Sequence, residues 1–206
     1  MSIATFSELK TAVAGWLSRG DLTPVIPDFI TMAEAEFNRR LRVRQMMVTQ
    51  TTTPSSSQFS LPTDFLTWRS VVWTGSPRAV LEYLDPQMLE AINPTQSAGV
   101  PSHFSILGTT DGVGVVKATP SSTVAIDFTY YQKVTALSTS NTTNWLLSAH
   151  PDVYLAGSLV EGFAYIQEFD NATVWKSRRE ELIEGVKRLD QQYRGPSAIM
   201  PAGATP

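Results

Sequence analysis

The chain has 206 residues, of which 42% are hydrophobic and 10% aromatic, a composition typical of a chain that folds around a core. Its 16 Lys and Arg against 19 Asp and Glu give a net charge of −3, which argues against a stand-alone DNA-binding protein because phosphate contacts need surplus cations. There is no cysteine and there are only two histidines, so disulfides, cysteine–zinc sites and three-histidine metal sites are excluded.

The charged residues are unevenly distributed along the chain. Residues 1–48 hold 11 of them and residues 148–206 hold 14, whereas residues 49–147 hold only 10, together with 30 Ser and Thr. Serine and threonine are tolerated on the solvent-facing positions of strands. The pattern therefore predicts helical ends and a β-structured centre.

Two helices are predicted in the N-terminal part. Thr5 and Glu8 match a capping box at the start of the first helix, and Gly20 is expected to end it. Pro27 suits the first turn of the second helix, which is expected to run to about Met47. Its apolar stripe recurs every four residues: Phe29, Ala33, Phe37 and Leu41. Because a short turn joins the two helices, we expect an antiparallel hairpin.

The centre of the chain shows strand patterns separated by turn residues. The clearest one covers residues 123–133, where apolar and polar side chains alternate. The other expected strands cover residues 49–53, 68–74, 78–84, 102–107 and 113–118. A short helix with Asp85 at its N-terminus is expected over residues 85–92.

The C-terminal part is predicted to form two more helices after a polar linker over residues 135–148. One helix opens at Pro151 and is apolar on several sides, so it is expected to be buried by the others. The last begins at Asp170 or Asn171 and carries a near-heptad apolar seam. Residues 195–206 contain three Pro, two Gly, three Ala and no charge, which predicts an extended tail.

These elements predict an α+β fold. The N- and C-terminal helices are expected to form a four-helix bundle, with a small antiparallel β domain inserted between them and an extended C-terminal tail. The expected segments are residues 1–48 (helical hairpin), 49–147 (inserted β domain), 148–194 (second helical hairpin) and 195–206 (C-terminal extension).

No motif for catalysis, cofactor binding or metal binding is found. His103 and His150 stand at the start of predicted elements, and no Gly-x-Ser-x-Gly motif supports a hydrolase. The glycines at 108–114 lie between two predicted strands, which favours a hairpin turn over a phosphate-binding loop. Glu34 and Glu36 are two residues apart on a helix, so they do not share a face and are predicted to be solvent-exposed. We predict no enzyme activity and no cofactor.

The strongest local charge feature is a cluster of arginines at the end of the second predicted helix: Arg39, Arg40, Arg42 and Arg44. Cations at this place complement the helix dipole, so the cluster could be a solvated helix end. It could also be a protein interface. A DNA contact is the third alternative, although the cluster is short and lacks interleaved aromatic residues.

The order of several short motifs resembles the adaptor, or head–tail connector, family of tailed bacteriophages, in particular the tail tubular protein A-like adaptors of short-tailed phages. The motifs are Ile26-Pro27-x-Phe29-Ile30, Asn38-Arg39-x-Leu41-Arg42, Leu61-Pro62-x-Asp64-Phe65-Leu66, Leu81-Glu82-Tyr83-Leu84-x-Pro86, Gly99-x-Pro101-x-x-Phe104, Phe128-x-Tyr130-Tyr131 and Asn144-Trp145-Leu146-Leu147-x-x-His150-Pro151-Asp152. The resemblance covers roughly residues 5–194.

The resemblance implies a structural protein of the virion, made in the host cytoplasm and placed at the neck between the capsid portal and the tail. It implies a homo-oligomeric ring of twelve subunits that contacts the portal protein and a tail or nozzle protein, with no membrane partner. Double-stranded DNA would pass through the ring without sequence-specific binding, and an acidic wall would let it slide during packaging and ejection.

The residues expected at the portal or inter-subunit interface are the arginine cluster and the end of the chain: Arg39, Arg40, Arg42, Arg44, Tyr193, Arg194, Gly195, Pro196, Ile199, Met200 and Pro201. The β domain is expected to face the tail. Two alternatives stay open: another ring or tail protein, such as a tail terminator or a head-completion protein, or an enzyme acting on surface polysaccharide. The enzyme would need a carboxylate pair in a cleft, with Asp64, Asp127 and His150 as the residues to mutate.

Overall fold

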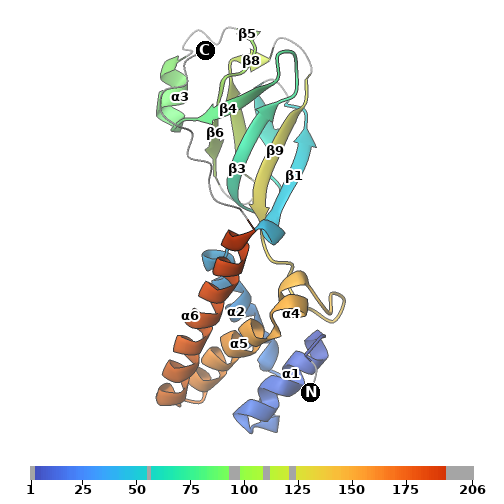
Figure 1. Cartoon of the computed structure of the whole chain (residues 1–206), viewed down its shortest axis with the longest axis vertical. Helices are drawn as coiled ribbons and strands as arrows, with labels where there is room; N and C mark the ends of the chain where they lie inside the picture. Colours follow the sequence, from blue (N-terminus) through green and yellow to red (C-terminus); the bar gives the residue numbers. More distant parts are fainter. Residues whose placement is uncertain (1–2, 55–56, 93–97, 109–111, 121–123, 194–206) are drawn as a thin grey trace. The chain divides into compact units, whose positions relative to one another are not determined.

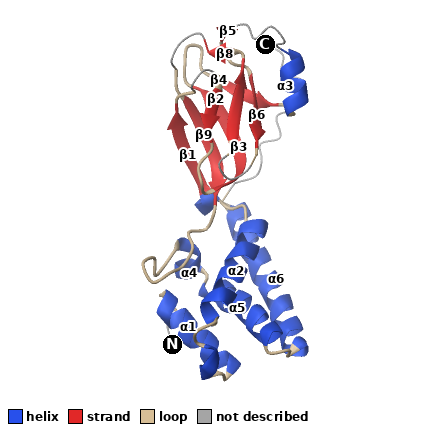
Figure 2. Cartoon of the chain, turned by 180° about the vertical axis from the view of Figure 1, so that it is seen from behind, coloured by secondary structure: helices blue, strands red, loops and turns tan. Residues whose placement is uncertain are grey.

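The computed structural model describes residues 3–54, 57–92, 98–108, 112–120 and 124–193. The chain divides into two compact units, each with its own core. The helical unit contains the described residues up to Arg44 and from Val134 onward, and the β unit is Gln45–Lys133. Figures 1 and 2 show that one unit consists of helices and that the other is built mainly of strands.

Five α-helices make up the described part of the helical unit. They are α1 (Phe6–Leu17), α2 (Ile26–Arg40), α4 (Trp145–Ala149), α5 (Pro151–Tyr165) and α6 (Phe169–Gln192), with a 3-10 turn, η1, at Gly20–Leu22. The capping box at α1 is confirmed, because the Thr5 hydroxyl accepts from the Glu8 amide while the Glu8 carboxylate accepts from the Thr5 amide. The helix ends earlier than expected, at Ser18, which has a left-handed φ of 52°.

Helix α5 lies at the centre of this unit and packs against α1, α2, α4 and α6. Its side chains are buried on several sides, as its sequence predicts. Two glycines allow close approach of its neighbours. A Cβ on Gly157 would lie 2.7 Å from the Phe37 ring of α2, and one on Gly162 would lie 2.8 Å from Leu17 of α1.

Gly157→Ala should destabilise the helical unit by about 1–3 kcal/mol, because the added methyl group overlaps a buried ring in a close-packed core. Gly185→Ala in α6 is the matched control, since a Cβ there meets nothing within 4 Å. The control should be neutral or stabilising by roughly 0.5–1 kcal/mol, as alanine is the better helix former. Urea unfolding followed by circular dichroism measures both effects. Equal effects of the two substitutions would show that α2 and α5 are not in close contact.

The β unit is built on a seven-stranded sheet. In spatial order its strands are β1 (Met47–Thr52), β9 (Ile126–Gln132), β3 (Phe65–Trp73), β4 (Ala79–Tyr83), β6 (His103–Leu107), β7 (Val113–Lys117) and β2 (Gln58–Ser60). Neighbours pair antiparallel except β4 with β6, which are parallel. A 3-10 turn, η2 (Arg44–Met46), spans the point in the sequence where the helical unit ends and the β unit begins. The β unit also contains helix α3 (Pro86–Ile92) and a two-stranded ladder of β5 (Ala98–Gly99) with β8 (Thr119–Pro120).

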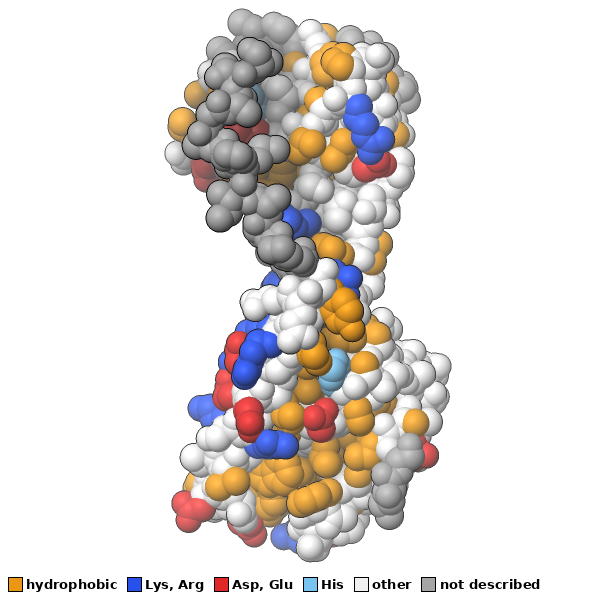
Figure 3. Space-filling view, in the orientation of Figure 1, with side chains coloured by type: hydrophobic (Ala, Val, Ile, Leu, Met, Phe, Trp, Pro, Cys, Tyr) orange, Lys and Arg blue, Asp and Glu red, His pale blue; other side chains and the backbone are white. Residues whose placement is uncertain are grey.

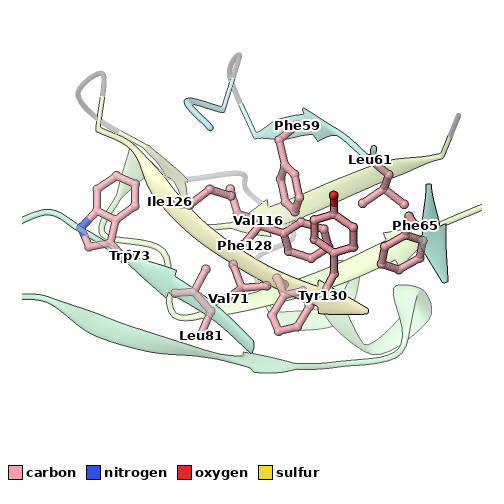
Figure 4. Close-up of a cluster of buried hydrophobic side chains, with 11 residues drawn as sticks. Phe59, Leu61, Phe65, Val71, Trp73, Leu81, Val116, Ile126, Phe128 and Tyr130 are labelled. Carbon is pink, nitrogen blue, oxygen red and sulfur yellow. The ribbon is translucent and has the colours of Figure 1, made fainter. Parts of the chain in front are cut away.

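The sheet curls around an aromatic core. Phe59 of β2, the last strand, packs edge-to-face on Phe128 of β9 with ring centroids 5.3 Å apart, although five positions in the strand order separate the two strands. Contact between such distant strands requires the sheet to bend back on itself as a half-barrel. Figure 4 shows Phe59, Phe65, Phe128 and Tyr130 gathered inside this curl.

The predicted architecture is wrong in two respects. The helices do not form a four-helix bundle, because α4 is a further helix and the others pack around a central α5. The β part is not a small insert, because it is a seven-stranded curled sheet with its own core. The fold is therefore α+β with six described α-helices and a half-barrel.

The second helix also ends earlier than expected. Residue Leu41 is already extended, with φ −88° and ψ 134°, and it stays fully buried, as does Val43 two residues later. Burial of every second residue is typical of an extended chain. The change from helix to extended chain was not predicted, because Leu41 also continues the four-residue apolar spacing of the helix. The predicted linker 135–148 contains α4, which Asn144 caps by accepting from the Leu147 amide.

Candidate interface site

The arginine cluster begins on the last turn of α2, where its first two members form ion pairs within the chain. Arg39 lies 2.7 Å from the Glu36 carboxylate and is 67% exposed. Arg40 binds Glu36 and also Glu180 of α6, so it joins two helices. The bond from Arg39 lowers the pKa of Glu36, and the bond from Arg40 lowers the pKa of Glu180.

The other two arginines follow the end of α2. One guanidinium nitrogen of Arg42 donates to the carbonyl of Asn38 at 2.7 Å. Arg44 donates to the buried carboxylate of Asp190 through its backbone N–H at 2.9 Å and its Nε at 3.3 Å. Its guanidinium also lies 4.6 Å from the centre of the Tyr193 ring, a cation–π contact.

The expected interface residues are thus brought together only in part. Arg44 meets Tyr193, and both stand where α6 ends. The remaining expected residues, namely Arg194, Gly195, Pro196, Ile199, Met200 and Pro201, lie outside the described residues. All four arginines bind groups of their own chain. Arg39 has a more exposed side chain than Arg40 or Arg44.

Arg179 and Glu34 are two of the buried charged residues that the sequence-based prediction missed. Arg179 of α6 is 6% exposed and lies 3.8 Å from Glu161 of α5 and 3.4 Å from Glu180. Glu34 of α2 is 4% exposed, although it was predicted to face solvent. A charged residue on a helix with several polar neighbours gives no sequence signal of burial, because only the packing of other helices creates it.

Glu34 is the centre of a polar network inside the helical unit. Its Oε1 accepts from the Leu137 backbone amide at 2.8 Å and from the Tyr154 hydroxyl at 3.0 Å. The Tyr154 oxygen in turn accepts from Asn144 at 2.6 Å. Burial raises the pKa of Glu34, partly offset by these two hydrogen bonds. The network fastens the segment before α4 to helices α2 and α5, and Asn38 adds a bond to the Val134 amide at 2.8 Å.

A groove of about 500 Å³ runs between the start of α5 and the C-terminal half of α6. Its apolar lining is Val153, Leu182, Gly185, Val186 and Leu189, and its polar lining is His150, Asp152, Arg178, Glu181, Arg188 and Gln192. Figure 3 shows one face of the helical unit, on which hydrophobic side chains are gathered. The large hydrophobic residues that remain exposed include Trp16 and Leu189.

The residues considered for catalysis have separate structural contacts. Asp64 accepts a hydrogen bond from the Tyr130 hydroxyl at 3.0 Å. Burial, and to a smaller extent this hydrogen bond, raises the pKa of Tyr130 to about 12. Asp127 accepts from Thr51 and Arg78, both at 2.9 Å. His150 ends α4 and precedes α5, in the other unit. Within the described ranges, no three His, Asp or Glu side chains gather in a way that could bind a metal ion.

A comparison with protein-family models matches residues 4–201 to the family described as SU10 adaptor protein. The chain belongs to the SU10 adaptor protein family. The match includes residues 195–201, beyond the range of the motifs noted in the sequence. A comparison with curated proteins gave no match.

As a member of the SU10 adaptor family, the chain is a structural adaptor protein of a bacteriophage and a component of the virion. Such a protein interacts with other virion proteins. None of the helices in the part of the chain that the structure describes combines the length and hydrophobicity needed to cross a membrane.

Proposed function

We propose that this SU10 adaptor protein forms a twelve-subunit ring at the neck, which joins the capsid portal to the tail and surrounds the DNA channel. The observation that carries the proposal is the family match over nearly the whole chain. The order of the sequence motifs adds support and favours the adaptors of short-tailed phages as a functional model. A head-to-tail contact between identical subunits closes into such a ring when the rotation between them is regular.

The portal contact is assigned to the C-terminal extension and the residues before it. The Asp190 carboxylate binds Arg44, and Arg44 contacts the Tyr193 ring, so Tyr193, two residues before the extension, is held to the helical unit. Residues 195–206 carry no charge and have only Ile199 and Met200 as large apolar side chains. A short uncharged segment of this kind suits a partner that supplies the apolar surface. The β unit is assigned to the tail or nozzle protein.

Deleting residues 195–206 should abolish binding to the portal while leaving a folded protein, because the described hydrophobic cores of the two units are formed by residues between Phe6 and Val186. Co-sedimentation with portal rings measures binding, and circular dichroism measures folding. A control variant replaces residues 195–206 by a Gly/Ser sequence of equal length, which keeps the length of the chain but removes the native side chains. This variant should also fail to bind. Normal binding by either variant would contradict the assignment of the extension.

An acidic wall for DNA passage is the second part of the proposal. The carboxylates assigned to it are Glu161, Glu168 and Glu184. Glu168 and Glu184 are exposed, whereas Glu161 is half-buried beside Arg179 at 3.8 Å. Exposed carboxylates repel the phosphates of DNA, so DNA is not held at the wall.

Replacing both Glu168 and Glu184 by glutamine should slow DNA ejection from virions, because two repulsive charges per subunit are removed from the channel wall. The control is Glu82→Gln with Asp21→Asn, an equal change in net charge at two exposed carboxylates. Ejection triggered in vitro and followed with a DNA-binding dye gives the rates. Equal rates for the wild type and the Glu168/Glu184 variant would contradict a role of these carboxylates.

A further inference from the structure

Two helices of the helical unit carry surface stripes that no described part of the chain covers. The first, the α6 stripe, lines the groove beside α5 and consists of Arg178, Leu182, Gly185, Leu189 and Gln192. These residues are spaced by four, three, four and three positions, so they lie on one face of α6. Leu189 is 47% exposed within this stripe.

The second stripe lies on α1. Thr11, Ala12, Gly15 and Trp16, together with Ile3, line a hollow of about 430 Å³ that contains no charged residue. Trp16 is 58% exposed and touches the rest of the unit through an edge-to-face contact with Trp175 at 5.3 Å. We call this surface the α1 stripe.

The glycines of these stripes differ from the other helical glycines. The described α-helices contain four glycines, and the space beside Gly157 and Gly162 is filled by Phe37 and Leu17 of neighbouring helices. Beside Gly15 and Gly185 nothing lies within 4 Å of an added Cβ. At the helix contacts of this unit, a side chain of the facing helix occupies the space beside the glycine. In each exposed stripe, the space beside one glycine is free of such a side chain.

We propose that the α1 stripe of one copy of this chain packs into the α5/α6 groove of the next copy. The groove lies between two helices, where the side chains of a third helix can pack, and α1 offers an uncharged stripe with a large exposed side chain to fill it. Close approach at Gly15 and Gly185 lets Trp16 and Leu189 cover the contact from its two sides. The inference rests on the proposed function, since it specifies the subunit contact of the ring.

The two stripes are unlike each other, and this determines the kind of assembly. A contact between different surfaces of identical subunits leaves a free groove at one end of a dimer and a free stripe at the other end. Further copies therefore add in the same direction until the ring closes. A contact of a surface with itself would stop at the dimer.

The chain has no cysteine, so single cysteines report this contact cleanly. Gly15→Cys and Gly185→Cys are made separately, and each side chain has room in its own helix. The two purified variants are mixed at high concentration and oxidised. We expect a disulfide-linked dimer in the mixture and none in either variant alone. A dimer from one variant alone, or no dimer in the mixture, would overturn the proposal.

The variant with both cysteines should give a ladder of dimers, trimers and larger species after oxidation. A monomer linked within itself would contradict the proposal. Adding Gly185→Trp to the Gly15→Cys partner should leave that partner fully able to link to Gly185→Cys, because its own groove is not used. In an otherwise wild-type chain, Gly185→Trp should prevent ring formation, whereas Gly185→Ala should not.

These results are distinguishable from a failure of the proposed function. If rings on the portal persist with Gly185→Trp, the ring stands and this contact is wrong. If the mixture forms the linked dimer but wild-type protein does not bind the portal, the contact stands and the portal assignment is wrong.

Discussion

Replacing Phe128 by alanine is expected to lower the free energy of unfolding of the β unit by about 3–5 kcal/mol. Phe128 is 1% exposed, and its ring lies within 6 Å of the rings of Phe59, Phe65 and Tyr130. It joins opposite walls of the curled sheet, so truncation leaves a cavity that neither wall can fill without uncurling. This is the largest stability effect that we predict.

The control for this substitution is Val80→Ala in β4, because Val80 is 72% exposed. Its effect should stay within about 0.5 kcal/mol, the usual range of a surface change. Since the core around Phe128 contains only residues of the β unit, the unfolding of the helical unit should not shift. Loss of both units in one step with Phe128→Ala would contradict two separate cores.

Glu34→Ala should destabilise the helical unit by about 2–4 kcal/mol, because two buried donors lose their acceptor. These are the Leu137 amide and the Tyr154 hydroxyl. The segment before α4 is held to α2 through this carboxylate, so amide hydrogen exchange at Leu137 should also accelerate. Asn38→Ala is a comparison, since it removes a single bond to Val134 and should cost about 1 kcal/mol.

The raised pKa of Glu34 gives the same site a pH dependence. Folding raises the pKa above its value in the unfolded chain, so the folded protein binds the proton more tightly. This contribution to stability is fully present below the unfolded pKa and is lost as the pH rises through the folded pKa. Glu34→Gln should remove this slope from the stability of the helical unit between acidic and neutral pH. A slope identical to that of the wild type would contradict a buried Glu34.

The local signals of the sequence predicted several elements well. Thr5 and Glu8 predict the start of α1, and the alternation before Gln132 predicts β9, because both signals depend only on neighbouring residues. The end of α2 was missed, since Leu41 fits a helical stripe and an extended chain equally well. The extent of the sheet was underestimated because β2 has only three residues and depends on β7 for its hydrogen bonds.

The interface residues illustrate the same limit. The sequence shows that Arg39, Arg40, Arg42 and Arg44 form a cluster, but not that each binds a group of its own chain. The partners of Arg40 and Arg44, which are Glu180 and Asp190, lie more than a hundred residues away, so no local pattern connects them. The grooves of the helical unit depend likewise on how helices distant in the sequence pack.

The central claim is an adaptor ring that assembles on the portal. Electron microscopy of the purified full chain, with and without portal rings from the same virus, tests it most directly. We predict a closed ring of this protein stacked on the portal in the mixture. Portal rings that remain bare in the presence of excess folded protein would contradict the claim.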